Sequence, residues 1–187
     1  TDQCDASFKL RAIGNIEVKG LPDQVTFKPG TFATIIEGLS VAGPGEVAIE
    51  LLDDDGNVAS TSNPIRAQAA GPLKHYWGDL HGQSEETIGT GTARQYFEYA
   101  RDRAFVDATG HQGNDFQITS PFWLQLDELC EEFDKPGSFV AIPGYEWSGN
   151  TGLGGDRNIY FPDEGRTLRR SSHALVQDHT DIDTDAN

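Results

Sequence analysis

The sequence predicts an α/β protein in two parts, a β-sandwich-like domain over residues 1–73 and an α/β region over residues 74–187. Three observations indicate this fold class. Short β-favouring segments separated by Pro and Gly fill the first part, and the Ser, Asn, Pro, Ala and Gly residues between 60 and 72 then interrupt all periodicity. Beyond that linker, strand-like and helix-like segments alternate. This order predicts parallel strands with right-handed crossovers, as in an α/β barrel or a doubly wound sheet.

The first part is expected to be a small antiparallel sandwich. Its four strands are predicted over residues 13–19, 24–27, 32–37 and 46–52, where β-favouring residues alternate or cluster between turn residues. The segment Asp53-Asp-Asp-Gly-Asn57 resembles part of a calcium loop, but it lacks the later bidentate carboxylate of an EF-hand. We interpret it as a hairpin turn, in which Asp-Gly supplies the positive-φ residues.

The second part is expected to hold four strands and two helices. The strands are predicted over residues 76–80, 104–109, 138–143 and 158–161. Thr92 and Gln95 have the spacing of a capping box, which predicts the start of a helix. Ser120 followed by Pro121 predicts the N-cap and the first residue of a second helix, whose apolar residues repeat at helical spacing up to Phe133.

Three side chains that can bind metals follow predicted strands. His81, His111 and Glu146 each lie within a few residues of a strand end, and parallel α/β folds gather their active sites at the carboxyl ends of the strands. Divalent metals bind imidazole and carboxylate, and they lower the pKa of water to about 7, which supplies hydroxide at neutral pH. The pattern therefore predicts a hydrolytic metal site. Neighbouring polar residues suited to the same site are Asp79, Gln83, Asn114, Asp115 and Asp156.

These residues also have plain structural interpretations. A single His is more often structural than catalytic, and we interpret His75 in that way because it precedes its strand. Glu146 can pair with Arg157, and Asp156 can be an ordinary loop carboxylate. His179 and the alternating aspartates after it lie in an acidic tail, which is typical of a solvated segment as well as of a calcium site.

The composition excludes several partners and informs localisation. Lys and Arg number 14 against 30 Asp and Glu, a formal net charge of −16, which repels nucleic acids and anionic membranes. No apolar run is long enough to cross a bilayer, and no signal peptide is visible at the start. Because Thr1 is not a translational start, we expect a segment to have been removed upstream, as after export to a bacterial periplasm or secretion. Cys4 and Cys130 can pair with each other, pair with another chain or stay reduced.

Two other enzyme classes are disfavoured. The Gly-rich segment 152–155 precedes a predicted strand and no helix follows it, so it does not match a dinucleotide-binding loop. The sequence has no Gly-x-Ser-x-Gly motif, and Cys130 lies on the apolar face of its predicted helix. Both observations argue against a Ser or Cys nucleophile.

Four motifs, in order, carry a resemblance to a known family. They are Trp77-Gly-Asp-Leu-His-Gly-Gln-Ser84, Gly110-His-Gln-Gly-Asn-Asp-Phe-Gln-Ile-Thr119, Pro143-Gly-Tyr-Glu-Trp-Ser148 and Gly155-Asp-Arg-Asn-Ile-Tyr-Phe161. Together they resemble the polymerase and histidinol phosphatase (PHP) superfamily. More narrowly, they are similar to a large bacterial branch that is described only as a domain of unknown function and has a β-rich segment before its barrel. The resemblance covers about residues 74–185.

The resemblance implies a distorted β/α barrel that binds two or three divalent ions, usually zinc, manganese or iron, and hydrolyses phosphoesters with metal-activated water. His81 matches the first His of the family's His-x-His motif, His111 the His of its Asp-His motif, and Glu146 the bridging Glu, so these three are the catalytic candidates. Gln83 replaces the second His, Gly110 stands where Asp is usual, and Asp156 stands where relatives often have His. The predicted metal ligands are His81, Gln83, His111, Asp115, Glu146, Asp156 and His179.

The length of the second part also departs from the family. Residues 74–187 are about half of the ~200 or more residues that a closed barrel needs. The resemblance therefore implies the first half of a barrel, completed by a second chain or a C-terminal fragment, that acts on a small anionic substrate. Two alternatives stay open: hydrolysis of C–O or C–N bonds on the same site, and a non-catalytic, metal-stabilised binding module.

Overall fold

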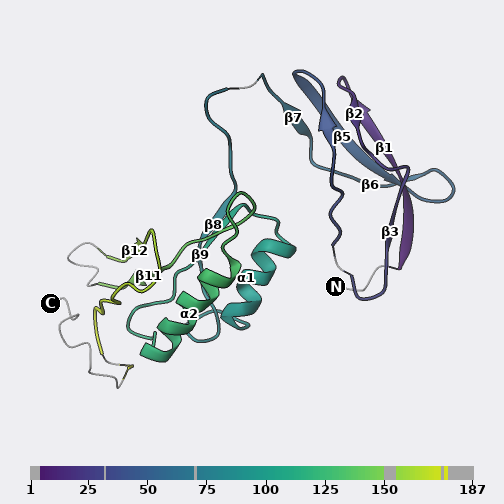
Figure 1. Cartoon of the computed structure of the whole chain (residues 1–187). Coiled ribbons are helices and arrows are strands. Elements are labelled where there is room, and N and C mark those ends of the chain that lie inside the picture. The colour runs from purple at the N-terminus through teal and green to yellow at the C-terminus, as the bar shows by residue number, and fades with distance from the viewer. Residues whose placement is uncertain (1–4, 32, 70, 150–154, 174, 177–187) are drawn as a thin grey trace. The chain divides into compact units, whose positions relative to one another are not determined.

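The computed structural model describes residues 5–31, 33–69, 71–149, 155–173 and 175–176 (Figure 1). The chain divides into two compact units, Thr1–Lys74 and His75–Asn187. Among the described residues, neither helix has the length and apolar character needed to cross a bilayer.

The first unit consists of antiparallel strands. Its main sheet has the order β3-β1-β5-β6, and β7 also pairs with β5; β2 and β4 form a separate two-stranded ribbon. Asp53 and Asn57 close the β5–β6 hairpin, and Gly56 adopts a φ of 84°, which confirms the predicted turn. The strands are β1 (Ala6–Gly14), β2 (Val18–Lys19), β3 (Gln24–Phe27), β4 (Ser40–Val41), β5 (Gly45–Leu52), β6 (Val58–Thr61) and β7 (Ile65–Ala67).

The prediction of a sandwich in this unit is wrong. Val47 is the one buried hydrophobic side chain among its described residues, so a second sheet has no apolar face to pack against. Residues 33–37 form no strand, and Ile35 is 66% exposed. Strand propensity reflects how well side chains fit a half-buried, pleated surface, and without such a surface the β-favouring residues here do not form a strand.

The second unit contains a small parallel sheet with two helices and a separate hairpin. The parallel sheet has the order β10-β9-β8, and β11 pairs with β12 in an antiparallel manner. Helices α1 and α2 lie side by side and contact β9 and β10, respectively (Figure 1). The elements are β8 (Gly78–Gly82), α1 (Ala93–Asp102), β9 (Ala108–His111), α2 (Ser120–Phe133), β10 (Val140–Ala141), β11 (Gly144–Trp147) and β12 (Arg157–Tyr160).

Both helices begin at capping residues. The Thr92 side chain accepts from the backbone N–H of Gln95 while the Gln95 side chain bonds back to Thr92, which confirms the predicted capping box. The N-cap of α2 is Thr119, one residue before the predicted Ser120. The apolar faces of the two helices form the core with residues of β10 and β11 and of the segments before α2, before β10 and after β12. Its members are Ala93, Phe97, Ala100, Ile118, Phe122, Trp123, Leu126, Leu129, Cys130, Phe133, Phe139, Ala141, Tyr145 and Leu168.

The predicted α/β class, with half of a β/α barrel, is also wrong. The described residues contain two short helices among four small sheets, and the parallel sheet has three strands. The predicted third strand over 138–143 is reduced to the two residues of β10. The predicted fourth strand becomes β12, which pairs with β11 and does not extend the parallel sheet. The fourth predicted strand therefore forms a hairpin and does not extend the parallel sheet, as the wall of a barrel would require.

Candidate functional site

Polar side chains gather where β8 and β9 end. The backbone N–H of Glu146, in β11, donates to the carbonyl of Gly113 in the loop after β9 (2.9 Å). The hydroxyl of Tyr160, in β12, donates to the carbonyl of Leu80 in β8 (2.6 Å). Both strands of the β11–β12 hairpin are therefore tied to the carboxyl end of the parallel sheet.

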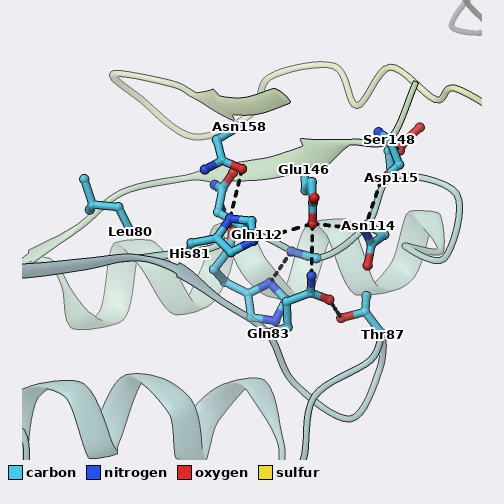
Figure 2. A network of polar contacts seen from close by, with 12 residues as sticks. Leu80, His81, Gln83, Thr87, Gln112, Asn114, Asp115, Glu146, Ser148 and Asn158 are labelled. Carbon is cyan, nitrogen blue, oxygen red and sulfur yellow. Dashed lines mark hydrogen bonds and ion pairs between the residues drawn. The ribbon is translucent and has the colours of Figure 1, made fainter. Parts of the chain in front are cut away.

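A local irregularity in β8 positions His81. Two residues of β8, Leu80 and His81, stand opposite the single residue Gly110 of β9, between the register pairs Asp79↔Thr109 and Gly82↔His111. An extra residue in one strand bends it and re-aims the side chains at that point. As a result, the His81 ring lies next to residues of the β11–β12 hairpin (Figure 2).

The carboxylate of Glu146 is the centre of the polar network (Figure 2). Glu146 is 9% exposed, and its Oε2 accepts hydrogen bonds from Gln83 Nε2 (3.1 Å) and Asn114 Nδ2 (3.0 Å). The Nε2 atom of His81 faces the same oxygen at 3.9 Å. Three nitrogens, two from the end of β8 and one from the loop after β9, thus surround one oxygen of a nearly buried carboxylate.

Asn158 fixes the tautomer of His81. The Nδ1 atom of His81 lies 3.0 Å from Oδ1 of Asn158, and because an amide oxygen only accepts, Nδ1 carries the proton. In the neutral ring, the Nε2 atom therefore has a free lone pair, and it is this atom that faces Glu146. Asn158 is the direct cross-strand partner of Glu146, so their side chains share one face of the hairpin.

Gln83 and Asn114 present their amide NH2 groups to Glu146. The Oε1 atom of Gln83 accepts from the hydroxyl of Thr87 (2.7 Å), and Asn114 Nδ2 also donates to Ser148 Oγ (2.9 Å). The Oδ1 atom of Asn114 is buried and has no hydrogen-bond partner among the described residues. A buried polar atom without a partner is uncommon and costly, so this oxygen needs an explanation.

His111 is buried, and both of its ring nitrogens are engaged. Its Nδ1 accepts from the backbone N–H of Gly113 (3.2 Å), so Nε2 carries the proton and donates to Ser84 Oγ (2.7 Å). Burial lowers the pKa of His111 to about 4, against a smaller opposing effect of Glu86. The ring is therefore neutral near pH 7 and is held by the loops on either side of it.

The other predicted ligands have different environments. Asp115 is fully buried, and its carboxylate accepts from the N–H of Ser148 (2.8 Å), from the N–H of Ser171 and from the Ser171 hydroxyl (3.2 Å). Its oxygens thus hold two backbone segments together. Asp156 is exposed, directly before β12, and His179 lies outside the described residues.

The donor set around Glu146 decides which metal ions could bind there. Among the residues that the structure describes, no three His, Cys, Asp or Glu side chains are grouped so as to hold a metal. The cluster instead combines one carboxylate and one imidazole with two amides, and amide and carboxylate oxygens suit magnesium, calcium and manganese. Gln83 and Asn114 carry amide oxygens of this kind, although it is their NH2 groups that face Glu146.

Comparison with known proteins identifies a family. The family model described as "Protein of unknown function (DUF3604)" matches residues 55–183, more than half of the chain. The chain belongs to the DUF3604 family. An uncharacterized protein of Chlamydia pneumoniae is 26% identical over 149 residues, which cover 79% of this chain and 24% of that protein. An uncharacterized protein of Chlamydia trachomatis serovar D is 25% identical over 123 residues, 65% of this chain and 20% of that protein.

This DUF3604 chain spans a quarter or less of the length of these relatives. No solved structure matches it.

The structure brings three of the predicted site residues of this DUF3604 chain together, namely His81, Gln83 and Glu146. Asn114 is among the polar residues predicted near the site, but its contact with Glu146 could not be predicted. That contact depends on how the loop after β9 runs along β11. Asn158 could not be identified as a site residue from the sequence. Its position opposite Glu146 follows only from the register of the β11–β12 hairpin.

Proposed function

We propose that this DUF3604 chain carries the active site of a metal-dependent hydrolase, with phosphoesters as the leading substrate class. The observation that supports this proposal is the convergence of His81, Gln83 and Asn114 on one carboxylate oxygen of Glu146. Burying a carboxylate is costly unless donors or a positive charge compensate it. A buried carboxylate at the end of a parallel sheet is therefore a suitable first ligand for a cation.

The residues divide into those that hold the cation and those that position them. Glu146, His81, Gln83 and Asn114 would hold it, and Asn158 keeps the His81 Nε2 lone pair available. When bound, a divalent cation supplies Lewis acidity, which acidifies water and polarises a phosphoryl oxygen. The His81 side chain is 54% exposed, so a small anionic substrate can reach this side of the site from solvent.

Phosphoesters are proposed first because of the four motifs. All four contain residues of the polar network around Glu146: 77–84 contains His81, 110–119 contains Asn114, 143–148 contains Glu146, and 155–161 contains Asn158. Their similarity to the PHP superfamily supports a phosphoester substrate. The same Lewis acidity also acts on carbonyl groups, so carboxylate esters and amides form the second substrate panel.

The test measures hydrolysis with and without metals. The purified chain is stripped with a chelator, reloaded with manganese, magnesium, zinc or iron, and assayed with phosphomonoesters, phosphodiesters, esters and amides. We expect turnover that chelation abolishes and metal restores. Glu146→Gln should lower kcat/KM by about 100-fold or more. Mutating a residue that only hydrogen-bonds to a metal ligand already lowers metal affinity or activity by about 10–100-fold, and Glu146 would be a ligand itself.

Glu98→Gln is the matched control, since Glu98 is an exposed residue of α1 and undergoes the same change. It should leave kcat/KM within about twofold. Turnover that persists in Glu146→Gln, or that does not depend on metal, would refute the proposal. The absence of turnover with every metal and both substrate panels would refute it for this chain as well.

A further inference from the structure

The two amides at Glu146 are turned the opposite way from metal ligands. Gln83 and Asn114 direct NH2 groups at Glu146 Oε2, at 3.1 and 3.0 Å, so their oxygens lie on the far sides. A half turn about the last side-chain bond of Gln or Asn exchanges nitrogen and oxygen with almost no change in shape, and that bond has a broad, roughly two-fold preference.

For Gln83, the half turn keeps its other contact. Oε1 now accepts from the Thr87 hydroxyl (2.7 Å). After the turn, the NH2 group occupies that position, and a hydroxyl oxygen accepts as readily as it donates. The only interaction that is lost is the hydrogen bond to Glu146, and the amide oxygen takes its place.

For Asn114, the half turn also places a different group at the buried position of Oδ1. Nδ2 now donates to Ser148 Oγ (2.9 Å), and after the turn the serine hydroxyl can donate to the amide oxygen. Oδ1 would gain Ser148 as a donor, and the NH2 group would take the buried position at which Oδ1 has no hydrogen-bond partner among the described residues. Asn114 is 8% exposed, so bulk water is a poor alternative partner for this oxygen.

We propose that Gln83 and Asn114 are paired amide switches that form a site for one oxygen-preferring divalent cation, such as Mn²⁺ or Mg²⁺. Without the cation, both amides donate to Glu146 and compensate its charge. With the cation, both turn, and their oxygens join Glu146 Oε2 and His81 Nε2 as ligands. This inference rests on the site of the proposed function and names its cation class, because amide and carboxylate oxygens favour manganese and magnesium.

The test measures Mn²⁺ affinity in the stripped chain, by electron paramagnetic resonance of free Mn²⁺ and by calorimetry. Gln83→Glu is the decisive variant, since it keeps the size of the side chain and replaces the amide by a carboxylate. In the cation-free protein it places two carboxylates about 3 Å apart, so the Tm should fall by about 5 °C. Added Mn²⁺ should recover that loss, and Mn²⁺ should bind about 10-fold or more tightly than to the wild type.

Two further variants and a control complete the set. Gln83→Leu, which has no oxygen, should weaken Mn²⁺ binding about 10-fold or more. Asn114→Asp should strengthen it as Gln83→Glu does. Gln95→Glu introduces the same charge in the capping box of α1, where Glu is also favoured, and it should leave Mn²⁺ affinity within about twofold. The Gln83 variants keep the test valid if the buried Asn114 variant does not fold.

Nuclear magnetic resonance supplies a readout of the amides themselves. The side-chain NH2 signals of Gln83 and Asn114 are assigned by their loss in Gln83→Leu and Asn114→Asp. Both should shift on saturation with diamagnetic Mg²⁺, whereas the Gln95 signal should not. Unchanged signals in a protein that binds the cation would overturn the switch.

The outcomes separate this inference from the proposed function. If Gln83→Glu loses stability but gains no Mn²⁺ affinity, the amides are donors only and the inference fails, even if the chain hydrolyses esters. If the affinities change as expected and no substrate is turned over, the cation site stands and the hydrolase proposal fails. If the wild type binds no Mn²⁺ or Mg²⁺ at millimolar concentration, the cation site is refuted.

Discussion

Asp115→Asn is expected to destabilise the second unit by about 3 kcal/mol. The fully buried carboxylate accepts hydrogen bonds from Ser148 and Ser171, two of them from backbone N–H groups. An Asn side chain accepts at only one terminal atom, so in either orientation its NH2 group meets an N–H group. A lost hydrogen bond to a charged group costs about 1.5–3 kcal/mol, and an unpaired buried donor costs about 1–3 kcal/mol more. A loss of about 3 kcal/mol is near the lower end of that sum.

Urea unfolding followed by tryptophan fluorescence measures this loss. All three tryptophans, Trp77, Trp123 and Trp147, lie in the second unit, so the signal reports on that unit. The control is Asp163→Asn, which removes an exposed ion pair with Arg166 and should cost less than about 1 kcal/mol.

A loss below about 1 kcal/mol in Asp115→Asn would refute the reasoning from its hydrogen bonds. A folded variant whose Mn²⁺ affinity falls about 10-fold or more would instead support Asp115 as a ligand.

Three other predictions concern single residues of the second unit. A Cβ at Gly82 would clash with the Tyr96 ring, so Gly82→Ala should cost about 1–3 kcal/mol in urea unfolding; an unchanged midpoint would contradict this. Phe105 has a φ of 53°, and Phe105→Asn should stabilise the unit by up to about 1 kcal/mol, since Asn tolerates the left-handed region; a lower Tm would speak against strain there. Burial raises the pKa of the Cys130 thiol to about 12, so mass spectrometry should show no alkylation of Cys130 by iodoacetamide at about pH 8 until the protein is denatured. Because the folded pKa is raised, the stability linked to this thiol is present below about pH 9 and is lost as the pH rises toward 12.

Features set by neighbouring residues could be predicted from the sequence. The capping box of Thr92 and Gln95 and the turn at Asp53–Asn57 are both present, because each depends on residues no more than four positions apart. The start of α2 differs by one residue, since Thr119 is also a favoured N-cap and proline is tolerated in the first turn of a helix.

Features that depend on distant contacts could not be predicted. The β-favouring residues at 158–161 predict a strand but do not indicate its partner. In the structure β12 pairs with β11 in a hairpin. Similarly, the position of His111 at a strand end predicts that it lies near the site. Its two ring nitrogens are instead hydrogen-bonded to Ser84 and Gly113. Gln83 reaches Glu146 across 63 residues of sequence. Side-chain partners at such separations follow from tertiary structure alone.

The additional residue in β8 makes the length of this strand part of the site. Deleting Leu80 would restore one-for-one pairing with β9 and move His81 by one strand position, about 3.3 Å. That shift is nearly as large as the whole 3.9 Å distance between His81 Nε2 and Glu146 Oε2. Replacing the 41% exposed Leu80 by another residue leaves this spacing unchanged. At this position, insertions and deletions should therefore be far more damaging than substitutions, and any redesign of the site has to preserve chain length before side-chain identity.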